Sequence, residues 1–64
     1  SSYPRHLVVL FHALCHTLSD FHLVDNQEQT LLRLIVQISE ICPELTAENK
    51  IVKENRAMLF EIAG

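Results

Sequence analysis

The chain has 64 residues, of which 48% are hydrophobic, with one glycine and two prolines. A chain of this length forms one domain at most, and it buries only about 60% of the surface that its unfolded form exposes. Its net charge is −3 and its five basic residues form no run, which argues against a nucleic-acid partner. The longest nearly apolar run, Leu7 to Leu18, is too short to span a bilayer. We therefore expect a single small domain that contacts neither nucleic acid nor membrane.

Breaks in the hydrophobic pattern divide the chain into three helical segments. Pro4 suits the start of the first, and the stretches "LVDNQ" and "CPELT" interrupt the pattern after it. Asp25 with Glu28 three residues later has the spacing of a capping box, and Thr46 is a natural N-cap. No segment alternates as a strand does. The pattern predicts an all-α fold, a small three-helix bundle or a helical hairpin plus a helix, with helices over 4–21, 26–42 and 46–62.

The first predicted helix is amphipathic. Histidines His12 and His16 lie on its polar side with Ser19 and Asp20. Its apolar residues recur at the spacing of three and four that places side chains on one helix face. The predicted core residues are Leu7, Leu10, Phe11, Leu14, Leu18 and Phe21.

The second predicted helix carries more apolar surface than one neighbour can cover. A second strip, formed by Leu32 and Val36, lies beside its main stripe. A helix with so wide an apolar arc belongs between two layers, so we expect this helix to be central. The residues of the main stripe are Leu31, Leu34, Ile35, Ile38, Ile41 and Cys42.

The third predicted helix has a polar residue within its apolar stripe. Asn55 lies between Ile51 and Met58 at heptad-like spacing, and Phe60 points away from this stripe. One interpretation of Asn55 is a boundary residue whose amide reaches water. The other is a buried amide that pairs across a helix interface and fixes register or oligomeric state.

Apolar residues outside these stripes predict an interaction surface. They are Val9, Leu32, Val36 and Phe60, one or two on each predicted helix. A contiguous apolar patch of this kind often marks a protein partner, although the same residues can also thicken a small core. We expect a homodimer completed around a two-fold axis, with Leu32, Val36, Asn55 and Phe60 in the interface and Val9 at its rim. The alternatives are a groove that binds an amphipathic helix of another protein, or one unit of a helical solenoid.

The segment "FHALCHTLSDFH" concentrates groups that bind metals or protons. His12 and His16 are four residues apart and are the candidate metal ligands, but Cys15 and His22 lie elsewhere around the helix. We therefore expect these histidines to be solvated, with no metal and no cofactor. A metal-stabilised or pH-responsive helix is the remaining alternative, because the only other histidine, His6, also lies in this first third of the chain.

The sequence offers no catalytic constellation. Cys15 and His16 are adjacent, so they face different directions on a helix and cannot form a nucleophile–base pair. The only glycine, Gly64, is the last residue, so there is no glycine-rich phosphate loop. With only Cys15 and Cys42 the chain has no disulfide framework, which favours an intracellular protein. The opening Ser-Ser and closing Ala-Gly favour a segment of a larger protein. We expect an interaction module that is not an enzyme.

Overall fold

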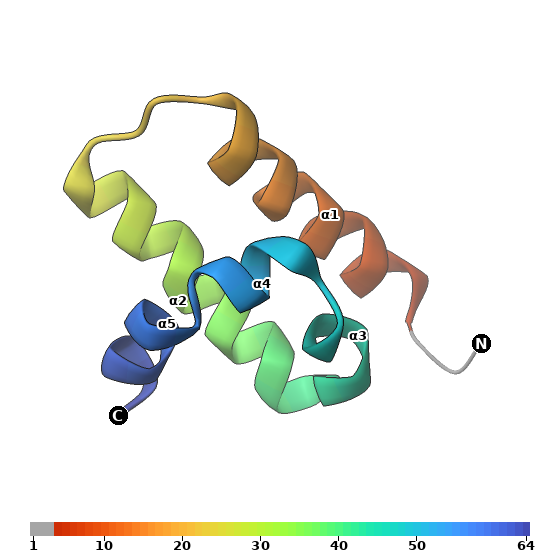
Figure 1. The fold of residues 1–64 in the computed structure, drawn as a ribbon. Helices are drawn as coiled ribbons and strands as arrows, with labels where there is room; N and C mark the ends of the chain where they lie inside the picture. The colour runs from red at the N-terminus through yellow and green to blue at the C-terminus, as the bar shows by residue number, and fades with distance from the viewer. Residues whose placement is uncertain (1–3) are drawn as a thin grey trace.

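The computed structural model describes residues 4–64, and within that range every regular element is an α-helix. The helices are α1 (Arg5–Asp20), α2 (Asp25–Ile41), α3 (Pro43–Ala47), α4 (Lys50–Glu54) and α5 (Arg56–Ala63). Helices α1 and α2 form a hairpin, and the chain then returns through α3 and α4 to place α5 against α2 (Figure 1). The predicted all-α class is confirmed.

The two helices of the hairpin have nearly the predicted bounds, each end lying within one residue of the expected position. The carbonyl of Pro4 accepts hydrogen bonds from the backbone N–H groups of Leu7 and Val8 at 3.1 and 3.2 Å, which starts α1. The predicted cap of α2 is wrong by one residue. Val24 occupies the N-cap, and its backbone N–H donates to the side-chain oxygen of Gln27 at 3.4 Å.

The third predicted helix, 46–62, is wrong, because the chain forms three short helices in place of one. Thr46 does not cap a helix: it lies buried in α3, where its hydroxyl accepts from Ser39 at 2.9 Å and donates to the carbonyl of Pro43 at 3.3 Å. The N-cap of α4 is Asn49, whose side-chain oxygen accepts from the N–H of Val52 at 3.1 Å.

Asn55 marks the second break, between α4 and α5. Its side-chain amide donates to the carbonyl of Ile51 at 2.8 Å, and its backbone has the dihedral angles φ −108° and ψ 18°. Asparagine side chains bond to nearby backbone groups and so compete with a regular helix. Asn49 and Asn55 therefore divide a stretch whose apolar spacing alone indicates a continuous helix.

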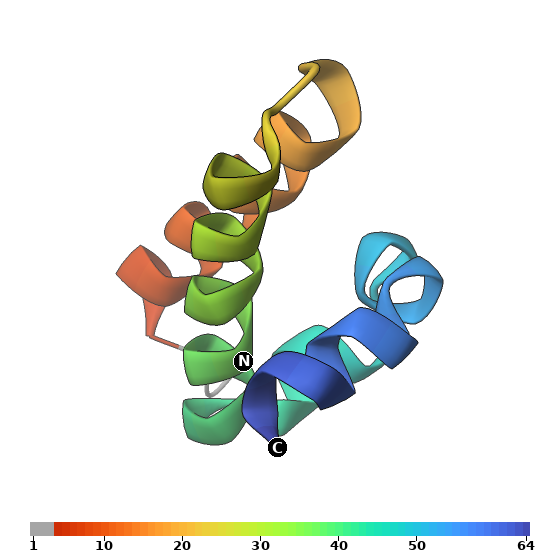
Figure 2. The ribbon, with the colours of Figure 1, turned by 90° about the vertical axis from the view of Figure 1, so that its left-hand side faces the viewer.

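The core lies where the hairpin and the returning segment meet. Helix α2 contacts α1, α3 and α5, so it is the central helix (Figure 2). Two cysteines, Cys15 and Cys42, are buried and are free thiols. The core cluster consists of Phe11, Leu14, Cys15, Leu32, Ile35 and Ile38, against which α3, α4 and α5 pack Leu45, Ile51, Val52, Leu59 and Ile62.

The buried face of α2 agrees only in part with the predicted stripe, of which Ile35, Ile38 and Cys42 are buried and Leu31 is partly buried. Leu32, expected in an intermolecular interface, is 0% exposed and belongs to the chain's own core. Leu34 and Ile41, expected in the core, are 38% and 64% exposed. The cause is the position of α5, which covers the flank of α2 that carries Leu32 and leaves the opposite flank to solvent. Leu10 in α1 and Phe21, which follows α1, are likewise 45% and 61% exposed and contribute little to the core.

Candidate protein-interaction site

An apolar groove lies between α2 and the pair α4 and α5. Its volume is about 260 Å³. Its charged residues are Glu40 on α2 and Arg56 on α5. We call this feature the α2–α5 groove, and it is lined by Val36, Ser39, Glu40, Val52, Arg56, Leu59, Phe60 and Ala63.

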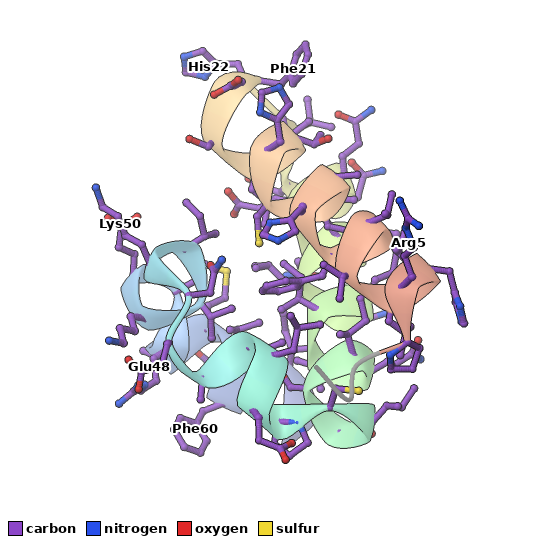
Figure 3. All side chains as sticks on the ribbon, turned by 90° about the vertical axis from the view of Figure 1, so that its right-hand side faces the viewer. Arg5, Phe21, His22, Glu48, Lys50 and Phe60 are labelled. Carbon is purple, nitrogen blue, oxygen red and sulfur yellow. The ribbon has the colours of Figure 1, made fainter. Side chains whose placement is uncertain are left out.

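Helical spacing explains how these residues reach one groove. Arg56, Leu59, Phe60 and Ala63 follow one another at steps of three, one and three, so they share one face of α5. Leu59 is half-buried and packs on the core, whereas Phe60 is 72% exposed. The ring of Phe60 extends away from the body of the molecule (Figure 3). The α2–α5 groove therefore combines a hydrophobic lining with an aromatic side chain free to contact a partner.

The five residues predicted for the interface do not form one surface. Val36 and Phe60 meet at the α2–α5 groove. Val9 is 62% exposed but lies on α1, next to a different hollow, and Leu32 is in the core. Asn55 uses its amide within the chain, at the joint between α4 and α5.

Sequence reasoning identified Phe60 on α5 but missed the other α5 residues that line the groove. Arg56, Leu59 and Ala63 line the groove but were not among the predicted interface residues. If Asn55 is taken as a helix boundary, the spacing of these residues with Phe60 predicts that they share one face of the helix that follows. The groove-lining face of α5 begins directly after the break at Asn55.

The four histidines were the candidate groups for a metal or proton site. All of them are exposed, and His16 pairs with Asp20 at an Nε2–Oδ2 distance of 3.1 Å. His22 lies beyond the end of α1, next to Phe21 (Figure 3). Over residues 4–64, no group of three or more histidine, cysteine or acidic side chains is arranged to hold a metal ion. The candidate ligands His12 and His16 therefore lie on an open helix surface without a third ligand.

Cys15 has a structural partner. Its thiol donates to the side-chain oxygen of Asn49 at 3.7 Å, so α1 contacts the residue that caps α4. Burial raises the pKa of the Cys15 thiol above its usual range, which keeps the sulfur protonated and poorly nucleophilic. This is the reverse of the environment that activates a catalytic cysteine.

The described part of the chain, residues 4–64, contains no helix with both the length and the hydropathy to traverse a bilayer. Comparisons with protein-family models, with curated proteins and with solved structures gave no match.

Proposed function

We propose that this chain is a homodimerisation module in which the α2–α5 grooves of two copies face each other. The observation that carries the proposal is Phe60, a large aromatic residue that is 72% exposed at the edge of an apolar groove. Buried aromatic side chains are frequent anchors of protein interfaces. In the proposed dimer, Phe60 of each copy enters the groove of the other and packs on Val36 and Leu59.

The charges of the groove favour a second copy as the partner. A two-fold interface is self-complementary: if one residue contacts another across it, the reverse contact occurs as well. The groove holds one acid, Glu40 on α2, and one base, Arg56 on α5. A two-fold arrangement that brings Glu40 of one copy to Arg56 of the other forms this oppositely charged contact twice.

The proposed dimer would bury about one sixth of the surface of each copy. A standard interface buries about 800 Å² per partner, about one sixth of the 4744 Å² surface of this chain. Each buried aromatic side chain accounts for roughly 150–250 Å² of such a surface. The remainder comes from the apolar lining and the charged rims. A small domain gains from such an interface because its own core is close to the lower limit for independent folding.

The proposed role is binding, without catalysis, in a reducing compartment. Both cysteines are free and buried, which fits an intracellular setting. A solenoid unit fits this chain less well, because such units stack as helix pairs, whereas the segment after α2 consists of helices of five, five and eight residues.

The proposal is tested by absolute mass in solution, measured by light scattering over a concentration series. We expect the wild-type chain to be a dimer and Phe60→Asp to be a monomer with unchanged helical circular dichroism. Val9→Asp is the matched control, since Val9 is 62% exposed and lies outside the groove, and this variant should remain a dimer. A wild-type monomer at every concentration would contradict the proposal, as would a dimer that Phe60→Asp leaves intact.

A charge-swap experiment tests the two-fold geometry. Glu40→Lys and Arg56→Glu each replace an attractive contact by a repulsive one, so each variant alone should dimerise more weakly. Mixing the two variants restores both oppositely charged contacts in a heterodimer. Recovery of the dimeric mass in the mixture supports the arrangement, and a mixture no more dimeric than the single variants contradicts it.

A further inference from the structure

The outer face of α1 carries a second apolar surface, separate from the α2–α5 groove. Val9 and Leu10 are 62% and 45% exposed, and with Ala13 they line a shallow hollow of about 670 Å³. Arg5 and His6 flank it on the preceding turn. We call this surface the α1 face. It shares no lining residue with the groove, and its Arg5 end lies well away from Phe60 (Figure 3).

Charge is distributed unevenly between the α1 face and the rest of the chain. Residues 1–19 contain one arginine, three histidines and no acidic residue, whereas all eight acidic residues lie from Asp20 onward. The first acid of α1, Asp20, is at its far end and pairs with His16. The apolar hollow is therefore bordered by the cation Arg5 and by His6, and by no acidic side chain, on a chain whose net charge is −3.

We propose that the α1 face binds an acidic amphipathic helix of another protein. Its apolar side chains pack on Val9, Leu10 and Ala13, and its carboxylates meet Arg5 and His6. The small side chain of Ala13 allows a second helix axis to approach closely, since the distance between packed helices depends on the side chains at the contact. Complementary charge on the incoming helix supplies specificity and a faster encounter.

A protein helix fits this surface better than an anionic membrane. Recognition of acidic lipids uses clusters of four to eight lysines and arginines, whereas α1 contains one arginine and no lysine. Helices that lie in the membrane interface also bury their main apolar stripe in lipid. In α1 that stripe is already covered, because Phe11 and Leu14 are 1% and 7% exposed within the core.

Two designed helical peptides test the proposal. Both carry the same leucine stripe, flanked by glutamates in one and by lysines in the other, and each is titrated into the ¹⁵N-labelled chain. We expect the glutamate peptide to bind at least about tenfold more tightly and to shift the amide signals of Arg5, His6, Val9, Leu10 and Ala13.

A charge reversal provides the matched control. Arg5→Glu should weaken binding of the glutamate peptide about tenfold, while Arg33→Glu, at an exposed position on α2 outside both surfaces, should leave it unchanged. Equal affinity for the two peptides, or no binding of either, overturns the proposal. So do shifts confined to Val36, Leu59 and Phe60, or tighter binding to vesicles of acidic phospholipid than to the peptide. Failure here leaves the proposed dimer untouched, because the two surfaces share no residues.

Discussion

The α1–α2 hairpin and the α3–α5 segment contribute to one core in different ways. The hairpin consists of helices of 16 and 17 residues, while the helices of the segment have five, five and eight. Isolated helices shorter than about 12–15 residues are marginal in water. The hairpin helices are long enough to show their apolar periodicity, whereas α3 and α5 depend on contact with α2, and α4 on contact with α1, α3 and α5.

The hairpin, which has the longer helices, is also the more deeply buried of the two regions. The hairpin supplies every residue of the buried core cluster, and α4 and α5 have no fully buried residue. Regions with few buried apolar contacts open locally at a lower free energy than the rest of the molecule. The α2–α5 groove lies at the boundary between the hairpin and the α3–α5 segment. A partner bound there would therefore stabilise the segment, which is the less buried of the two.

The largest expected effect on stability comes from Leu32, a core residue of the hairpin in the cluster against which the α3–α5 segment packs. Leu32→Ala should lower the free energy of unfolding by roughly 2–5 kcal/mol, because it opens a cavity where α2 meets the segment. For a chain of this length, the total stability is about 3–10 kcal/mol. Leu34→Ala, on the same helix but 38% exposed, is the control and should cost less. Chemical denaturation followed by circular dichroism measures the loss of unfolding free energy in both variants. Equal losses would contradict the packing of α5 against the flank of α2 that carries Leu32.

A smaller effect on stability is expected for Asn49 than for Leu32, and a still smaller one for Asn55. Asn49→Ala removes the cap of α4 and the acceptor for the Cys15 thiol, and should cost about 1 kcal/mol. Asn55→Ala loses a hydrogen bond to Ile51 but gains helix propensity, so its stability should change by less than about 0.5 kcal/mol. Hydrogen exchange should show faster opening in α4 and α5 for Asn49→Ala, with the hairpin protected. Equal exchange in both regions would contradict the proposed difference between them.

The smallest effect is on the pH dependence of stability. Burial raises the pKa of Cys15 in the folded chain, so the unfolded chain loses this proton first as the pH rises. The contribution of Cys15 to stability is therefore complete below the ordinary cysteine pKa of about 8.5 and declines as the pH rises through the folded value. Denaturation between pH 7 and 9.5 should show this decline, and Cys15→Ala should flatten it. An unchanged slope in the variant would exclude Cys15 as the cause.

Among the candidate interface residues, the sequence prediction had mixed outcomes on both α2 and α5. Val36 and Phe60 lie at the groove, where an apolar residue outside the main stripe was expected to mark a surface. The same reasoning was wrong for Leu32, because apolar spacing cannot tell which of two flanks a neighbouring helix covers. It also missed Leu59 and Ala63, which follow the break at Asn55.

The sequence by itself determined the all-α class and the two long helices, because periodicity over more than four turns and clear helix breaks leave little choice locally. Only the tertiary structure decided which side of α2 is buried and how the last third of the chain divides. Those outcomes depend on where α5 packs and on the helix breaks at Asn49 and Asn55, whose side chains hydrogen-bond to Val52 and Ile51. Short helices take their direction from such contacts with the core, which a one-dimensional pattern does not record.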